Sequence, residues 1–151
     1  MNRIWIYQSK HQLSESEAYN IAKDMNAFVN GWAAHNHKLD ARFEIQQNRF
    51  ILLTVNQEEV HASGCSIDDL YRFIQDLDLK YNLGILDRRQ MAFINKNGEI
   101  QVCGLDDISS LYQDKILLDD TYIFNNTIQD ASLLNSEWKI PFKKSGFAAF
   151  V

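Results

Sequence analysis

The stretch Ala41-Arg-Phe-Glu-Ile-Gln-Gln-Asn-Arg-Phe-Ile-Leu-Leu-Thr-Val55 contains the strongest indication of the fold. Every second residue from Ala41 to Ile45 is apolar, as in a strand that is buried on one face only. The residues from 50 to 55 are almost continuously apolar, which is typical of a central strand. Gln47-Asn48 lies between the two runs and is a turn signal, so the stretch predicts an antiparallel hairpin.

Amphipathic helices are predicted on both sides of this hairpin. Before it, Ser14-Glu-Ser-Glu17 is a capping-box signature, and apolar residues at helical spacing follow as far as Trp32. After it, Ser66-Ile-Asp-Asp69 predicts a second helix start, whose apolar face continues to Tyr81. Short apolar strands are expected before the first helix, at 3–8, and after the second helix, at 91–94.

The order of these elements indicates an α+β fold, with a mostly antiparallel sheet and helices on one face. The elements before Asn95 read as β-α-β-β-α-β, the order of a ferredoxin-like sandwich. Asn97-Gly98 predicts one more hairpin, and a C-terminal extension follows it. A chain of 151 residues is expected to form a single domain, 1–151. Its aromatic, basic tail, 138–151, is expected to dock onto the core or onto a second copy in a homodimer.

The composition limits the classes of function. The formal net charge is −5, which disfavours binding to nucleic acid or to an anionic membrane. The sequence shows neither a signal-peptide region nor a long apolar run, so we expect a soluble cytoplasmic protein with reduced thiols. It also lacks the motif G-x-x-x-x-G-K-[ST] of a nucleotide-binding P-loop. We therefore expect no ATPase activity and no cofactor.

The segment His61-Ala-Ser-Gly-Cys-Ser-Ile-Asp-Asp69 joins the central strand to the second helix. Cys65 would lie near the helix N-terminus, where backbone N–H groups stabilise a thiolate, with His61 as a candidate base. Gly64 would allow a ligand to approach the backbone, and Gly64 and Ser66 are the candidate ligand-binding residues of this turn. The simpler interpretation, which we favour, is a small buried cysteine at the junction with Ser66 as the helix cap.

Two histidines are weak candidates for a metal site. His35 and His37 are two residues apart and share a face if the segment is extended, and imidazole suits zinc, copper or nickel. The third ligand would come from one of three side chains: His61, Asp40 or Cys65. We favour a solvated loop without a metal, because no complete ligand spacing is present.

Arg49 is the remaining candidate for ligand binding. It follows the bend of the first hairpin, where its guanidinium group could bind a carboxylate or a phosphate. We favour a surface charge at the end of a strand, because that is the more frequent role of such an arginine.

Three segments carry a resemblance to a known family: Phe43-Glu-Ile-Gln-Gln-Asn-Arg-Phe50, Ser63-Gly-Cys-Ser-Ile-Asp68 and Asp120-Thr-Tyr-Ile-Phe-Asn-Asn126. Over nearly its whole length the chain resembles a family of small bacterial proteins of unassigned function, which are often labelled "ABC transporter ATPase". The resemblance implies no catalytic residues. Because the P-loop is lacking, we interpret the chain as a module that binds a partner protein or a small molecule. The alternative is a thiol-dependent enzyme that uses Cys65.

Overall fold

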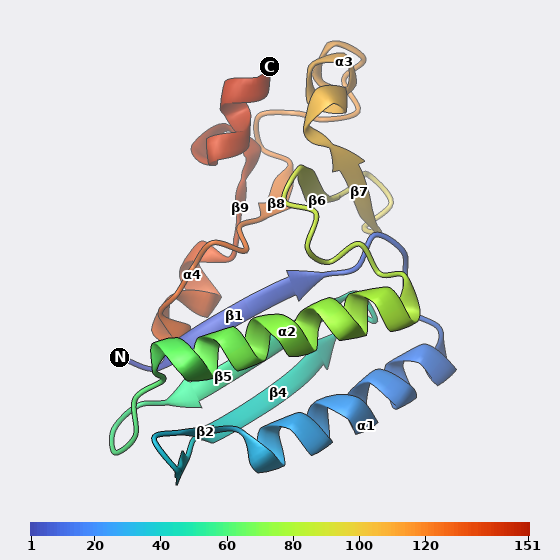
Figure 1. Ribbon diagram of the computed structural model, residues 1–151. Coiled ribbons are helices and arrows are strands. Elements are labelled where there is room, and N and C mark those ends of the chain that lie inside the picture. Colours follow the sequence, from blue (N-terminus) through green and yellow to red (C-terminus); the bar gives the residue numbers. More distant parts are fainter. The chain divides into compact units, whose positions relative to one another are not determined.

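The computed structural model describes the whole chain, from Met1 to Val151 (Figure 1). The chain forms two compact units, and each contains an antiparallel sheet and helices. The first unit comprises Met1–Leu86 and Ile128–Ser132, and the second comprises Asp87–Thr127 and Leu133–Val151. The predicted α+β class is confirmed. None of the helices has both the length and the apolar character that crossing a membrane requires.

The sheet of the first unit contains the predicted hairpin. Its strands are β1 (Arg3–Gln8), β5 (Phe50–Asn56) and β4 (Asp40–Gln46), in that order across the sheet, and all neighbours are antiparallel. Gln47 and Asn48 connect β4 to β5 with positive φ angles of 55° and 49°. This left-handed turn matches the twist of the two strands, so the hairpin closes tightly.

Helices α1 (Glu15–Gly31) and α2 (Gly64–Tyr81) lie on the same side of this sheet (Figure 1). The apolar faces of both helices and every second residue of β5 form one buried cluster. Its helical and β5 members include Ile21, Met25, Val29, Ile51, Leu53, Val55, Leu70, Ile74 and Leu77. The prediction of helices on one face is confirmed for this unit, because the helical spacing and the strand alternation present complementary apolar surfaces.

The two long helices begin in the same way, but only one start is predicted correctly. At α1, Ser14 Oγ accepts a hydrogen bond from Glu17 N, and the Glu17 carboxylate accepts one from Ser14 N. At α2 the N-cap is Ser63, whose Oγ accepts from Ser66 N at 3.1 Å. The predicted cap at Ser66 with Asp69 is therefore wrong. Serine is present at both positions, and the earlier one adds a turn to the helix.

A small hairpin follows α1, where the sequence predicts only a loop. Strands β2 (Ala33–Ala34) and β3 (His37–Lys38) pair with each other in antiparallel fashion. His35 and Asn36 form the turn between them, with φ angles of 50° and 65°. Strands of two residues are too short to show an apolar alternation, so this hairpin leaves no pattern in the sequence.

The second unit contains a four-stranded antiparallel sheet. The order of its strands is β7 (Ile100–Gly104), β6 (Gln90–Ile94), β8 (Tyr122–Phe124) and β9 (Lys139–Pro141). The hairpin predicted from Asn97-Gly98 is confirmed, since it connects β6 to β7. Short helices complete the chain: α3 (Ile108–Gln113), α4 (Leu134–Glu137) and the 3₁₀ helices Leu105–Asp107, Ala131–Leu133, Phe142–Lys144 and Gly146–Phe150.

The ferredoxin-like start is not confirmed. Strand β6 is the last strand of the predicted β-α-β-β-α-β order, and it pairs with β7 and β8 rather than with β1, β4 or β5. The tail 138–151 contributes β9 and the buried Phe142 to the second unit. Docking of this tail onto a second copy, and cooperative folding of residues 1–151 as one domain, stay predictions.

Candidate functional site

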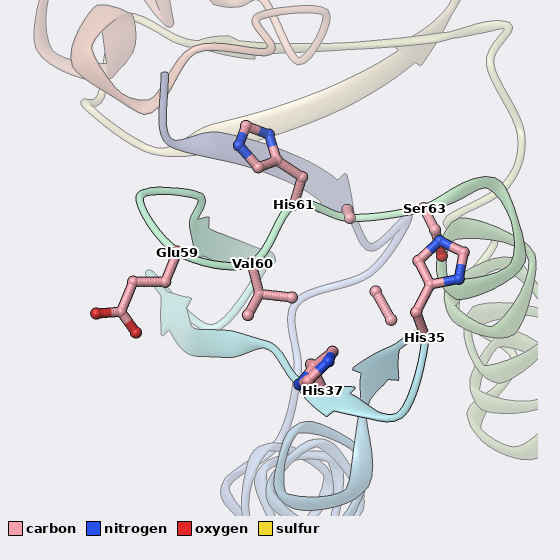
Figure 2. A pocket seen from close by; sticks show the side chains of 8 residues that line it. His35, His37, Glu59, Val60, His61 and Ser63 are labelled. Carbon is pink, nitrogen blue, oxygen red and sulfur yellow. The ribbon is translucent and has the colours of Figure 1, made fainter.

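A surface hollow of about 400 Å³ lies in the first unit (Figure 2). One side comes from the β2–β3 hairpin, with Ala34, His35 and His37. The other side comes from the segment 59–63 between β5 and α2. The chain has four histidines, and three of them line this hollow: His35, His37 and His61. A volume of this size suits a small metabolite.

Hydrogen bonds made by side chains hold the segment between β5 and α2 in place. Ala62 N donates to Gln57 Oε1 at 3.0 Å, and Glu58 N donates to Asn56 Oδ1 at 3.1 Å. The same Gln57 side chain donates to Met1 O at 3.2 Å. These bonds satisfy backbone groups that a strand or helix would otherwise pair, so the loop has a defined shape.

Trp32 connects the two sides of the hollow. It is the last residue before β2, and its indole Nε1 donates a buried hydrogen bond of 2.8 Å to Ser66 O in the first turn of α2. Its backbone carbonyl accepts from Leu39 N at 3.0 Å, just after β3. The hairpin and the start of α2 are thereby fixed relative to each other, so the hollow is formed before any ligand binds.

The side chains around the hollow offer polar groups above an apolar floor. All three histidines are exposed, and none has a hydrogen bond from its ring. Figure 2 shows the three rings well apart from one another, with the His61 ring and the Glu59 carboxylate both directed away from the other labelled side chains. The apolar surface between them comes from three short side chains: Ala34, Val60 and Ala62. Imidazole can donate or accept hydrogen bonds, so the site is equipped for polar groups of a ligand.

A metal is not the ligand that this arrangement favours. The structure holds no group of three or more histidine, cysteine, aspartate or glutamate side chains placed to bind one ion. His35 lies in the turn and His37 in β3, so the two rings do not share a face as they would in an extended segment. The structure therefore gives no support to the ligand set proposed from the sequence.

The exposure of Cys65 contradicts the interpretation that the sequence favours. It is the second residue of α2 and is exposed, whereas the buried cysteine of the chain is Cys103. The idea of a buried cysteine that fills the junction is therefore wrong. Cys65 is not among the residues that line the hollow, and no hydrogen bond joins it to His61. The two residues predicted as a catalytic pair are close in sequence, but the structure does not show them as a pair.

Of the other two candidates in this turn, Ser66 has a structural role and Gly64 shows none. The Ser66 hydroxyl accepts from Ser63 N at 2.7 Å and donates to Ser63 O at 2.8 Å, so the helix cap occupies it. Gly64 is exposed, its φ is not positive, and a Cβ atom there would meet nothing within 4 Å. Neither of these two residues lines the hollow.

Arg49 is buried, so the expectation of a surface charge is wrong. Its guanidinium Nη1 donates to Ser9 O at 3.2 Å and to Lys10 O at 3.0 Å, and only 9% of the residue is exposed. Burial lowers the pKa of this guanidinium. The group joins the β4–β5 turn to the segment after β1, which is a structural role rather than binding of a phosphate.

The sequence names all three histidines, and it offers His61 as one of three possible third ligands beside His35 and His37. It gives no indication that the three line one hollow. Their common hollow depends on the β2–β3 hairpin and on the bond from Trp32 to Ser66, and neither feature has a local signal. Glu59 and Val60 were missed entirely.

A second hollow, of about 480 Å³, lies between α1 and α2. Two of its three polar side chains are already engaged, because Asp24 forms an ion pair with Lys80 at 2.9 Å and accepts from Tyr81 Oη at 2.7 Å. The hollow with the three histidines therefore has more free polar groups to offer.

The chain matches no protein-family model, no curated protein and no solved structure. Function must therefore be inferred from the site alone.

Proposed function

We propose that the protein is a binding protein whose ligand is a small polar molecule with an anionic group, held in the hollow between the β2–β3 hairpin and the start of α2. The observation that carries this proposal is the placement of His35, His37 and His61 around one preformed hollow. Histidine rings donate hydrogen bonds to carboxylate or phosphate oxygens, and they do so more strongly when protonated.

The exposure of the three rings supports binding over a structural role. A histidine that stabilises a fold usually has a fixed partner, as His11 has in Glu17, whose carboxylate lies 3.0 Å from His11 Nε2. His35, His37 and His61 have no such partner in the chain. The apolar floor would contact the carbon skeleton of a ligand, while the rings would bind its charged end.

The test measures binding of citrate and inorganic phosphate by NMR chemical-shift changes in the histidine rings. We expect citrate to shift the rings of His35, His37 and His61 and to leave His11 unchanged. The variant with His35, His37 and His61 all changed to alanine has no ring to observe in the hollow, so its citrate binding is measured by isothermal titration calorimetry and should be much weaker than that of the wild type. His11→Gln is the matched control, and it should bind as the wild type does. Absence of any shift with both anions, or equal shifts at His11, would contradict the proposal.

A thiol-dependent enzyme that uses Cys65 is the second candidate. One observation favours it: the sulfur is exposed at the second position of an 18-residue helix, where backbone N–H groups favour a thiolate. No base is positioned beside it, so the binding function ranks first. Replacement of Cys65 by serine leaves citrate binding unchanged if the histidine hollow is the site.

We also propose that the protein works in the cytoplasm and belongs with the small bacterial proteins that its sequence resembles. Both cysteines are free, which fits a reducing compartment. Isolation of the protein from bacterial cells with both thiols reduced would support this location, and a disulfide between copies would count against it.

A further inference from the structure

The outer side of strand β4 has no partner within the chain. The sheet of the first unit ends with β4, whose only neighbour is β5 (Figure 1). In an antiparallel strand every second residue directs its N–H and C=O groups away from such a neighbour, so an edge strand can accept a further strand. At the beginning of this edge the N–H group of Ala41 is not available to a further strand, because it donates to Leu39 O at 3.0 Å.

Two charged side chains on β4 are also without a partner. Arg42 and Glu44 are both exposed, and neither forms an ion pair or a side-chain hydrogen bond. They flank Phe43, which packs against the core from the opposite face of the strand. Because the side-chain period of a strand is two, Arg42 and Glu44 lie on one face of the sheet.

We propose that β4 pairs with β4 of a second copy, antiparallel and centred on Phe43. In this register Arg42 lies opposite Glu44 of the second copy, and Glu44 lies opposite Arg42 of the second copy. Phe43 meets Phe43, and Ala41 meets Ile45, so the apolar face is continuous as well. The two three-stranded sheets become one sheet across a two-fold axis.

The charges of β4 select this register over its neighbours. A two-fold axis perpendicular to the sheet keeps each side chain on its own face of the sheet. Moving the axis by one residue along β4 therefore shifts the pairing by two residues, so each symmetric register pairs the charged face with the charged face. With the centre at Arg42, that arginine would face itself, and Glu44 would face Asp40 of the second copy. With the centre at Glu44, that glutamate would face itself. A centre at Ala41 would also pair Arg42 with Asp40 of the second copy, but the hydrogen bond from Ala41 N to Leu39 O occupies the edge there. Of the centres on the open part of the edge at Arg42, Phe43 and Glu44, the one at Phe43 brings opposite charges together twice.

A second copy fits this edge better than an unrelated strand does. Charged side chains on an edge strand normally discourage pairing, because a random partner leaves them unmatched. Here the sequence Arg-Phe-Glu is its own complement when it is read antiparallel. Opposite charges across neighbouring strands stabilise a pair, and like charges destabilise it.

Charge-reversal variants test the proposal by analytical ultracentrifugation of the full chain. We expect the wild type to form a dimer. Arg42→Glu and Glu44→Arg should each raise the dimer dissociation constant about tenfold or more, because two attractive pairs become repulsive. The double variant R42E/E44R should restore the wild-type value, since it exchanges the charges within each pair.

Lys96→Glu and Glu99→Arg are the matched controls, because they make the same charge changes at exposed positions of the second unit. Both should leave the dissociation constant unchanged. A wild type that is monomeric at all concentrations overturns the proposal. So does a dimer that neither single variant weakens, or one that the double variant fails to restore.

Disulfide formation between the two copies tests the register. The exposed Cys65 is first replaced by serine, so that it cannot form disulfides of its own. Copies that carry Arg42→Cys and copies that carry Glu44→Cys are mixed and oxidised. The mixed disulfide should form in preference to a disulfide between identical copies, because residue 42 faces residue 44 in the proposed register. Equal yields of all three products would overturn this register. The histidine hollow takes no part in the pairing, so this proposal stands or falls separately from the binding function.

Discussion

The indole Nε1 of Trp32 donates a hydrogen bond of 2.8 Å to the carbonyl oxygen of Ser66, and so joins the end of α1 to the first turn of α2. The bond is buried and spans 34 residues of sequence. Trp32 also contacts Trp5 edge to face and Phe28 at a tilt, so its position is fixed by packing as well as by the bond. We therefore expect the shape of the histidine hollow to depend on this connection.

Trp32→Phe tests this connection. The variant keeps an aromatic ring but loses the donor and part of the packed volume, so we expect unfolding in urea to require about 1–3 kcal/mol less free energy. Citrate binding in the hollow should weaken at the same time. Trp138→Phe is the control, since it removes a comparable bond, to Asn126 Oδ1, in the second unit. Unchanged binding in Trp32→Phe would show that the hollow does not depend on this bond.

The two cysteines should differ widely in reactivity. Burial, with a contribution from the negative charge of Asp107, raises the pKa of the Cys103 thiol to about 11. Little thiolate is then present at pH 8, whereas Cys65 is exposed at the helix start. We expect iodoacetamide to modify Cys65 at least about tenfold faster, as measured by mass spectrometry of tryptic peptides. Similar rates at the two positions would contradict the burial of Cys103 and the thiol candidate together.

Asp24 should make the stability of the first unit depend on pH. Hydrogen bonds from Lys80 and then from Tyr81 lower the pKa of this carboxyl group. The folded state thus favours the ionised form, and this stabilisation is complete above the unfolded pKa of about 3.9. It is lost as the pH falls through the lower folded pKa.

Asp24→Asn measures this contribution. At pH 7 the variant should be less stable than the wild type by about 0.5–1 kcal/mol, a small value because the pair is partly exposed. The difference should shrink as acid titrates Asp24 in the wild type, as followed by urea unfolding at a series of pH values. Asp120→Asn, at an exposed position without a side-chain bond, should show no such trend. A constant difference across the series would refute the electrostatic explanation.

Phe142 should be essential for the second unit. It is 1% exposed, packs in the core of that unit and contacts the ring of Tyr112. Phe142→Ala should therefore cost about 3–5 kcal/mol in unfolding free energy. Phe150→Ala, in the same tail but 46% exposed, should cost far less. Small and equal effects of the two changes on urea unfolding would mean that the tail is a loosely attached arm.

Local patterns predicted the parts of this fold that depend on neighbouring residues. The turn at Gln47-Asn48 and the capping box at Ser14 succeed because a few adjacent residues determine their backbone angles and hydrogen bonds. The assignment of β6 to one sheet with β1 fails, because partner choice depends on contacts that are far apart in sequence. The environment of Arg49 fails for the same reason, since its partners, Ser9 and Lys10, lie about forty residues away.

Two glycines that look alike in the sequence should respond to alanine in opposite directions. Gly98 has a φ of 78° in the β6–β7 turn, where an L-residue is strained, so Gly98→Ala should cost about 1 kcal/mol or more. Gly64 lies in the first turn of α2 without a positive φ, and a Cβ atom there meets nothing within 4 Å. Gly64→Ala should stabilise the protein by about 0.4–1 kcal/mol, because it restricts the unfolded chain. Thermal unfolding of both variants measures these changes in stability.

Citrate binding by Gly64→Ala shows whether the open space beside the start of α2 matters for the ligand. A stabilised variant that still binds citrate would assign Gly64 no part in the site, whereas a loss of binding would extend the site from the histidines to the first turn of α2.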